Sequence, residues 1–327
     1  MKNAEIKYYN SVESRNVDWL WYPYIPYGKI TIIQGDPGEG KTTFVLNLAA
    51  LLSKGETFPN QENNKADPVV VIYQNAEDGI ADTIKPRLDS VDADCNNIAF
   101  LEVGNKHLTL NDSRLEQAII KSNAKLLVFD PLQAYIGNVD MHRANDIRPI
   151  MKSLATVAEN TGCAIVLVGH MNKSSNKGLY RGLGSIDITA AARSVLLVGR
   201  VADDPNIRAV SHIKSNLAPE GASFAFELNP DSGFRWIGDY SISSDELLGN
   251  YQSPDESKPE LAQKIISTLF EKHASILSET IYDICLSKGI SRRTVERAKK
   301  LLNLCAVKIH TKWYYVLPQN TKEGIDE

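Results

Sequence analysis

Between about residue 29 and residue 240, short runs of apolar residues are separated by longer stretches with helical periodicity. The runs show no polar alternation, which is typical of parallel strands covered on both faces. Helical patterns at about 42–52, 79–90, 112–123 and 145–161 lie between them, so the chain predicts a mostly parallel α/β sheet with helices on both sides. The predicted strands are residues 29–34, 68–73, 98–101, 124–129, 163–168 and 194–198.

The hydrophobic pattern changes after residue 207. Residues 207–213 and 223–228 alternate apolar and polar side chains, with turn residues between them. Alternation of this kind predicts an antiparallel extension of the sheet. Residues 241–259 are rich in Ser, Asp, Glu, Gly, Pro and Asn, so they are interpreted as a linker. Residues 1–28 are expected to form a separate N-terminal segment before the first α/β strand.

A second compact unit is expected at residues 260–318. Helical patterns at 260–273 and 278–287 precede a third helix over 292–303, for which Ser291 is the expected N-cap. Residues 306–310 and 312–317 then indicate a β-hairpin. Three helices followed by a hairpin predict a small α+β winged-helix domain, a variant of the helix-turn-helix. Residues 319–327 are polar and are expected to be a disordered tail.

Composition narrows the class of protein. The chain has 327 residues, a net charge of −4 and 43% hydrophobic residues, which is typical of a globular protein. No apolar run approaches the ~18 residues of a membrane span, and the N-terminus has no apolar signal core. The four cysteines lie far apart and favour neither a metal site nor a disulfide. We therefore expect a cytoplasmic protein without a membrane partner.

Charge is distributed unevenly along the chain. Residues 258–312 contain eleven Lys or Arg and five Asp or Glu, a local net charge of +6, and the remainder is near −10. A basic module on an acidic body suggests a nucleic-acid partner for that module. A solvated helix face is the competing interpretation.

The segment GDPGEGKT at residues 35–42 matches the G-x-x-x-x-G-K-[ST] pattern of a phosphate-binding loop. It follows a predicted strand and precedes a predicted helix, which is the context that the motif requires. Backbone N–H groups at the helix start would bind the phosphates of ATP, and the lysine would reach the outer ones. The predicted ATP-binding residues are Gly35, Gly38, Glu39, Gly40, Lys41, Thr42 and Thr43.

Three further residues complete the expected active site. Asp130 ends an apolar strand and, with the Thr42 hydroxyl, is expected to bind Mg²⁺. Because a proline follows Asp130, the base that activates water must come from elsewhere, and Glu77 at the end of another strand is the candidate. Asp78 is assigned to capping the next helix, although both acids could serve only as caps. His170 also ends a strand, where it could sense the γ-phosphate or be a structural histidine.

Several motifs occur in an order that carries a resemblance to a known family: residues 35–43, 76–78, 86–88, 130, 170–173, 182–185, 191–193 and 214–217. Over about residues 17–240 the chain resembles the RecA-like ATPases related to the hexameric RepA replicative helicases of plasmids and phages. The resemblance implies a RecA-like fold and a homo-oligomer, a hexameric ring with ATP bound between neighbours. It implies a cation supplied in trans, with Arg200 as the first candidate, then Lys214, and Arg208 as the weakest. It also suggests that Arg87 stacks on adenine.

The resemblance places single-stranded DNA in the central channel of the ring, against loops 137–146 and 172–185. Basic groups for phosphates and an aromatic for stacking suit that role, and the candidates are Arg143, Lys173, Lys177 and Arg181. A flexible surface loop can also be basic without binding DNA.

The third helix of the C-terminal unit is also basic. In a helix-turn-helix this element enters the major groove of duplex DNA. Docking of another replication protein on the same face is the alternative. The basic residues on this helix are Arg292, Arg293, Arg297, Lys299 and Lys300.

Two functions fit these residues. One is a Mg²⁺- and ATP-dependent, DNA-stimulated helicase or translocase that acts in replication of a plasmid, phage or mobile element. The other is an ATP-gated DNA-binding regulator or recombination factor that does not unwind DNA. The same ATP site serves both, because a fold does not determine a function.

Overall fold

The computed structural model describes residues 6–59, 61, 66–102, 104, 107–171, 186–201, 204–229, 232–249, 258–288, 290–309 and 311–317. The chain divides into two compact units, Met1–Tyr251 and Gln252–Glu327. The hydrophobic clusters of the first unit share no residue with the cluster of the second.

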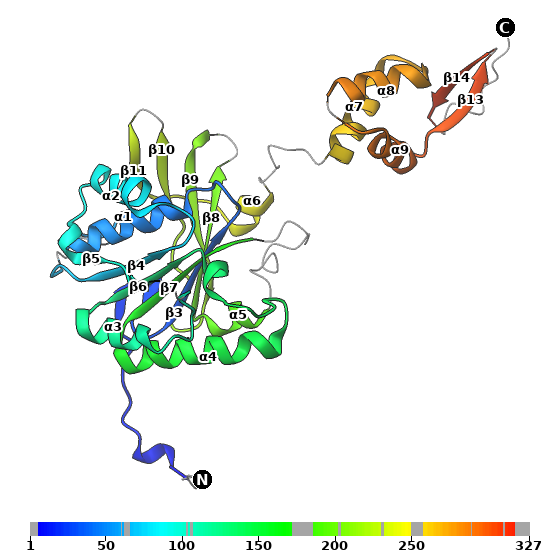
Figure 1. Ribbon diagram of the computed structural model, residues 1–327. Coiled ribbons are helices and arrows are strands. Elements are labelled where there is room, and N and C mark those ends of the chain that lie inside the picture. The colour runs from blue at the N-terminus through cyan, green and yellow to red at the C-terminus, as the bar shows by residue number, and fades with distance from the viewer. Residues whose placement is uncertain are drawn as a thin grey trace. The chain divides into compact units, whose positions relative to one another are not determined.

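A nine-stranded sheet forms the centre of the first unit, in the order β11-β10-β9-β8-β3-β7-β6-β4-β5 (Figure 1). The strands from β8 to β5 in that order are parallel, whereas β9, β10 and β11 continue the sheet in antiparallel pairing. This confirms the predicted mostly parallel α/β sheet. The strands are β3 (Ile30–Gly35), β4 (Val71–Asn75), β5 (Ile98–Ala99), β6 (Leu126–Asp130), β7 (Ala164–His170), β8 (Ser194–Val201), β9 (Asp204–Ser215), β10 (Phe224–Asn229) and β11 (Gly233–Asp239).

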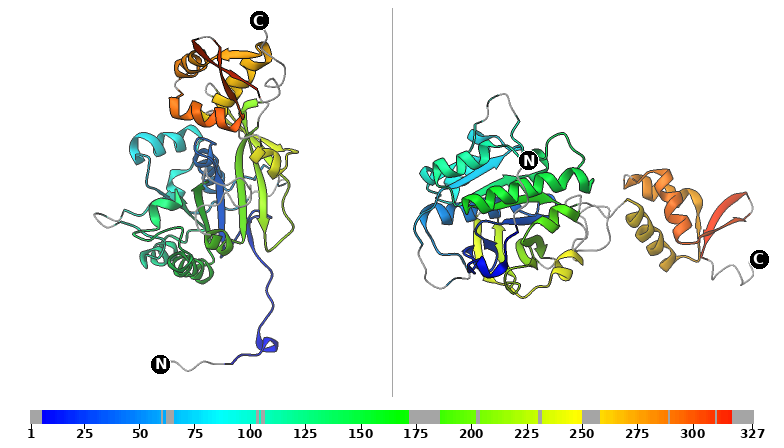
Figure 2. Two further views of the ribbon diagram at one scale, coloured as in Figure 1. Left: turned by 90° about the vertical axis from the view of Figure 1, so that its right-hand side faces the viewer. Right: turned by 90° about the horizontal axis from the view of Figure 1, so that it is seen from below.

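Successive residues of the central strands face opposite sides of the sheet, so each strand contributes to two cores. Ile32 and Leu127 pack on the side of α3, α4 and α5, whereas Ile33 and Val128 pack on the side of α1 and α2. Figures 1 and 2 show helices on both faces of the sheet. The helices of this unit are α1 (Lys41–Lys54), α2 (Lys85–Ser90), α3 (Arg114–Ser122), α4 (Ala144–Thr161), α5 (Ile186–Ala191) and α6 (Ser244–Gly249).

Two predicted segments differ from the structure. The helix expected at 79–90 is a π-helical segment, η2 (Ile80–Ile84), followed by the short α2, which has a proline in its first turn. Proline has no N–H to donate and so interrupts a regular helix. The expected linker contains α6, whose Leu247 is buried. Ser243 and Glu246 form a reciprocal capping box there, a signal that the polar composition concealed.

Part of the expected N-terminal segment packs into the core of the first unit. A small antiparallel pair, β1 (Trp19–Trp21) and β2 (Ile25–Pro26), carries the fully buried Trp21. That indole stacks on Phe58 with ring centroids 4.8 Å apart. Residues 6–18, which include a short 3-10 helix, are exposed throughout.

The described residues of the second unit form three helices and a three-stranded antiparallel sheet of order β12-β14-β13. The sequence pattern missed the short β12, whose Ile276 is buried. Ser291 caps the third helix by accepting a hydrogen bond from the Thr294 backbone N–H. The elements in chain order are α7 (Lys258–Lys272), β12 (Ser275–Leu277), α8 (Ser278–Ser287), α9 (Arg292–Leu301), β13 (Cys305–Ile309) and β14 (Lys312–Val316). Within the described ranges of both units, no helix is long and apolar enough to span a membrane.

Candidate active site

The polar residues predicted from the strand ends converge on the carboxyl edge of the parallel strands. Gly35 at the end of β3 is the register partner of His170 on β7. Asn75 at the end of β4 is the register partner of Asp130 on β6. Four neighbouring strands therefore bring the phosphate loop, an acid and a histidine to one edge, where open parallel sheets bind ligands.

The phosphate loop between β3 and α1 depends on its glycines. Gly38 and Gly40 have φ angles of 81° and 82°, a region that residues with a Cβ rarely adopt. A Cβ on Gly35 would lie 2.2 Å from the carbonyl oxygen of Val198, so β8 passes too close for a larger residue. The loop leaves Lys41 at the first position of α1, where helix N–H groups are available for an anion.

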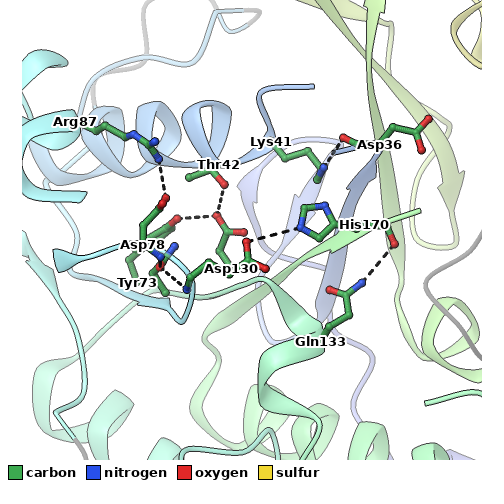
Figure 3. A network of polar contacts seen from close by, with 11 residues as sticks. Asp36, Lys41, Thr42, Tyr73, Asp78, Arg87, Asp130, Gln133 and His170 are labelled. Carbon is green, nitrogen blue, oxygen red and sulfur yellow. Dashed lines mark hydrogen bonds and ion pairs between the residues drawn. The ribbon is translucent and has the colours of Figure 1, made fainter. Parts of the chain in front are cut away.

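Lys41 is buried, and its Nζ donates a hydrogen bond of 2.7 Å to the backbone oxygen of Asp36 (Figure 3). Burial lowers the pKa of Lys41 to about 8, against the opposing effect of Asp130 and Asp36. An anion that enters the loop gives this ammonium group a strong partner, because a buried site screens opposite charges less than water does.

Thr42 and Asp130 meet in the site. The hydroxyls of Thr42 and Tyr73 each donate a 2.7 Å hydrogen bond to the same oxygen, Oδ2 of Asp130 (Figure 3). A hydroxyl and a carboxylate side by side are oxygen ligands of the kind that Mg²⁺ prefers, so these residues fit the predicted ion. Burial, and then the Asp130 charge, raise the pKa of Tyr73 well above its ordinary value, so Tyr73 remains a neutral donor.

Glu77 and His170 face each other at the site. Glu77 Oε2 lies 4.0 Å from His170 Nε2, and the Glu77 side chain is 63% exposed. The side-chain oxygen of Asn75 accepts hydrogen bonds from the backbone N–H groups of Glu77 and Asp78, which shapes this turn. Burial, and then the charge of Lys41, lower the pKa of His170, so the imidazole is neutral near pH 7. An exposed carboxylate beside a neutral imidazole is suited to contact with water.

The assignment of Asp78 to helix capping is wrong. Gly79 precedes η2, and among the described residues no side chain caps that segment. Asp78 Oδ2 instead accepts a 2.8 Å hydrogen bond from Arg87 (Figure 3). The cause is the irregular start of the helix, where Asn75 already holds the backbone N–H groups of the turn. The acid therefore fixes the guanidinium of Arg87 and not the end of a helix.

Arg87 also lines a cavity of about 720 Å³ beside the start of α1. Thr43 comes to this cavity from α1, and Phe234 and Trp236 come from β11. A guanidinium and two aromatic rings suit a planar, partly apolar group such as a nucleobase. Sequence reasoning missed both aromatics, although the alternation of residues 233–237 after a turn could have revealed the strand.

A second cavity, of about 800 Å³, lies against β5 and η2. Its lining is mostly apolar and includes Ile80, Ile84 and Phe100. No described residue of the phosphate loop lines it, so the loop and the smaller cavity define the candidate nucleotide site.

The three candidate trans cations occupy different places. Arg200 and Arg208 lie beside Glu39 of their own phosphate loop, with Nε atoms 3.8 and 3.7 Å from Glu39 Oε2. Lys214 is near the far end of β9, which runs antiparallel to β8. Its Nζ donates hydrogen bonds of 2.7 and 2.8 Å to backbone oxygens at the end of α5.

The predicted nucleic-acid residues have different outcomes. Arg143 is exposed, and its Nε lies 3.5 Å from a carboxylate oxygen of Asp140. The other three candidates of the first unit, Lys173, Lys177 and Arg181, lie outside the described residues. Four of the basic side chains on α9 are exposed, namely Arg292, Arg293, Arg297 and Lys300.

Lys299 is the exception on α9, because its side chain is buried. It is 4% exposed, and its Nζ donates hydrogen bonds to Glu296, Tyr282 and Tyr315 at 2.6, 2.6 and 2.7 Å. Burial lowers the pKa of Lys299, but these three bonds outweigh it and raise the pKa above the ordinary value. The helix turns this lysine toward the core, so it supports the unit and not a ligand.

The chain is similar to a known domain family and to two known proteins. The family described as AAA domain matches residues 3–176, more than half of the chain. A DNA repair protein RadA of Halalkalibacterium halodurans is 26% identical over 149 residues, which cover 45% of this chain and 28% of that protein. A DNA repair protein RadA of Campylobacter jejuni is 24% identical over 178 residues, covering 53% of this chain and 36% of that protein. The chain thus spans about a third of the length of these relatives.

Two solved structures are similar at low sequence identity. A KaiC-like protein of Pyrococcus horikoshii is 18% identical with a TM-score of 0.48, covering 66% of this chain and 91% of that one. The ATPase domain of G40P is 16% identical with a TM-score of 0.49, covering 65% of this chain and 85% of that one.

Proposed function

Because the chain belongs to the AAA domain family, we propose that it is a Mg²⁺-dependent ATP hydrolase that acts on DNA as a RecA-like ring, as a replicative helicase or translocase. One observation supports the proposed ATP hydrolysis. The residues expected to bind and cleave ATP lie together at the carboxyl edge of the sheet, namely Lys41, Thr42, Asp130, Glu77 and His170. The relatives named DNA repair protein RadA support a DNA substrate.

The groups around the phosphates have roles that their positions support. Lys41 exchanges its hydrogen bond to Asp36 for the outer phosphates, and the glycine loop supplies backbone donors. Thr42 and Asp130 hold Mg²⁺, which neutralises phosphate charge when it is bound.

The remaining residues contact the attacking water, the γ-phosphate and the adenine ring. Glu77 orients and deprotonates the attacking water, and the neutral His170 beside it contacts the γ-phosphate. Arg87 and Trp236 receive the adenine in the smaller cavity.

Lys214 is our preferred cation in trans. Arg200 and Arg208 already contact the phosphate loop of their own chain, whereas Lys214 lies near the opposite end of β9. In the single chain its ammonium group donates hydrogen bonds to carbonyl oxygens at the end of α5. A phosphate of ATP bound to a neighbouring subunit would replace these acceptors. If the site is shared in this way, the specific ATPase activity falls as the protein is diluted. A constant activity far below the concentration at which it assembles would argue for a self-contained monomer.

The second unit supports a DNA or protein contact. Its order of helices and strands, with β14 between β12 and β13, is compatible with a winged-helix domain. Arg292, Arg293 and Arg297 are exposed on α9. We propose that this face binds duplex DNA, with a replication protein as the other candidate partner. Single-stranded DNA would contact Arg143 and loop 172–185 in the ring.

A strand-displacement assay on forked DNA tests the helicase. The wild-type protein should separate strands with ATP and Mg²⁺, and Lys41→Ala should not. Glu77→Gln should still bind ATP but turn it over about a hundredfold more slowly or worse, because the base is lost. Wild-type turnover by Glu77→Gln would remove Glu77 from the mechanism.

The alternative is an ATP-gated DNA-binding regulator or recombination factor. The observation that favours it is the name of the RadA relatives, which are DNA repair proteins. DNA binding that depends on ATP, without any strand displacement by the wild-type protein, would support this function over the helicase.

A further inference from the structure

Glu39 places a carboxylate inside the phosphate loop, directly before Gly40 and Lys41. An acid in this position repels the phosphates of a nucleotide unless other groups neutralise it. The Glu39 side chain is only 5% exposed, so solvent does little to screen its charge. The compensating charge must therefore come from the fold.

Two arginines, one from β8 and one from β9, lie beside this carboxylate. Arg208 on β9 is 8% exposed, and its Nε lies 3.7 Å from Glu39 Oε2. Arg200 on β8 is 40% exposed, and its Nε lies 3.8 Å from the same oxygen. Within the described residues, Glu39 Oε2 and both Nε atoms have no hydrogen-bond partner. The contact is an ion-paired cluster of two positive groups and one negative group, without direct hydrogen bonds between these atoms.

Two glycines of the loop also lie close to strands in this part of the sheet. A Cβ added to Gly40 would lie 2.5 Å from Leu228 Cδ1 and 3.6 Å from Phe226, both on β10. A Cβ on Gly35 would meet the Val198 carbonyl of β8. Strands β8 and β10 therefore approach the loop at Gly35 and Gly40, and Glu39 is its charged point of contact with β8 and β9.

Arg208 is itself anchored. One of its terminal nitrogens donates to the backbone oxygen of Pro205 at 2.5 Å. Burial raises the pKa of Glu39, and the two arginines oppose that shift. Burial, and then the charge of Arg200, lower the pKa of Arg208. Each buried charge is therefore costly alone and is stabilised by the other, which is the condition for a strong coupling between them.

We propose that Glu39 is a positioning residue for nucleotide binding: through Arg208 and Arg200 it fixes the phosphate loop to β8 and β9. Arg200 then acts within its own chain, on the loop, and not as a finger in a neighbouring site. The inference rests on the proposed ATP site and adds to it the device that holds the loop in its binding geometry.

The direction in which Glu39→Gln changes the Kd for nucleotide distinguishes a positioning role from simple electrostatic repulsion. Glu39→Gln removes a negative charge near the phosphates, so repulsion alone predicts tighter binding of Mg²⁺ and a nonhydrolysable ATP analogue. Positioning predicts weaker binding, because the loop loses its contact and Arg208 loses its counter-ion. We expect the Kd, measured by calorimetry on the full chain, to rise about tenfold.

A double-mutant cycle tests the pair directly. Arg208→Gln should also raise the Kd. Because the two partners act together, the Kd of the double variant should be no higher than that of the single variant with the higher Kd. Glu56→Gln, the same change just beyond the opposite end of α1, is the matched control and should leave the Kd unchanged. A thermal unfolding curve for each variant shows that it is folded. At saturating ATP, kcat should change little while KM rises.

Each result decides one question. Wild-type or lower Kd for Glu39→Gln, with no binding by Lys41→Ala, would overturn the positioning role and leave the ATP site intact. No binding by the wild-type protein would overturn the ATP site and this inference together. Additive effects in the cycle would show that Glu39 and Arg208 act separately, contrary to the proposal.

Discussion

Asp130 shows how single residues set the chemistry of this site. Its Oδ2 accepts from a threonine that is expected to bind Mg²⁺ and from Tyr73, which is 3% exposed. A buried neutral donor on a metal-binding carboxylate fixes the orientation of that carboxylate. The sequence did not single out Tyr73, because a tyrosine inside a buried strand looks like an ordinary core residue.

Removal of the Tyr73 hydroxyl should weaken Mg²⁺ binding. In Tyr73→Phe the ring still fills the core, but Oδ2 of Asp130 loses one of its two hydroxyl donors. We expect the Mg²⁺ concentration for half-maximal ATPase activity to rise about tenfold, the low end for groups that orient a metal ligand. Tyr135→Phe, on the neighbouring 3-10 helix η4 (Leu132–Tyr135), is the control. An unchanged Mg²⁺ dependence in Tyr73→Phe would contradict the role.

We expect His212 on β9 to make the stability of the protein depend on pH. It is buried, its Nδ1 accepts from the Gly221 backbone N–H at 2.9 Å, and its Nε2 lies 3.0 Å from the Ser194 hydroxyl. Burial lowers the pKa of His212 to about 4, from 6.5. As the pH falls below 6.5 the unfolded chain takes up this proton first, so the free energy of unfolding decreases down to about pH 4 by roughly 3 kcal/mol.

Urea unfolding at pH 7.5 and pH 5 measures this effect. His212→Asn keeps an acceptor near Gly221 but cannot titrate, so its stability should change less between the two pH values than that of the wild-type protein. Equal changes in both proteins would show that other groups cause the pH dependence.

At the scale of elements, the approach of β8 to β3 determines what the phosphate loop tolerates. A Cβ at Gly35 would collide with the backbone of β8, whereas a Cβ at Gly38 would meet no described atom within 4 Å. Gly38, however, has a φ of 81°, which strains a residue with a side chain. Within one loop, a larger residue is therefore excluded at Gly35 by a steric clash and disfavoured at Gly38 by the backbone conformation.

This pair gives a matched test of stability. Gly38→Ala should destabilise the protein by about 1–2 kcal/mol through backbone strain alone. Gly35→Ala should cost more, about 3 kcal/mol or above, because two paired strands must separate. Urea unfolding of both variants measures the difference. A larger decrease in the free energy of unfolding for Gly38→Ala than for Gly35→Ala would show that β8 can move away from β3 at little cost.

The strands and the loop could be predicted because their signals are local. Residues 126–130 and 164–170 are apolar runs that end in a polar residue, and GDPGEGKT is a contiguous motif. The cluster of Glu39, Arg200 and Arg208 could not be predicted, since the acid lies about 160 residues before the arginines and meets them only through the order of the sheet. The cavity beside Arg87 was missed for a related reason, because the strand that carries Trp236 was not expected.

At the scale of the whole molecule, the two units have separate cores. The described cluster residues of the first unit end at Leu248, and those of the second begin at Leu261. A fragment of residues 1–251 should therefore fold by itself, keep its unfolding temperature within a few degrees and bind ATP as the full chain does.

Thermal unfolding of the fragment, of residues 252–327 and of the full chain checks this independence. Coincidence of the two fragment curves with two steps of the full chain is the expected result. Failure of residues 1–251 to bind ATP, while the full chain binds it, would show that the second unit contributes to the site.

Trp236 has a practical consequence for experiments on this protein. Its indole lines the cavity next to Arg87, with the Phe234 ring 4.8 Å away, whereas Trp21 is sealed in the core. A nucleobase that enters the cavity would change the polarity around Trp236, whereas Trp19, Trp21 and Trp313 do not line this cavity and would contribute a background emission. Intrinsic fluorescence would then report occupancy of the site without a dye, in rapid mixing as well as at equilibrium.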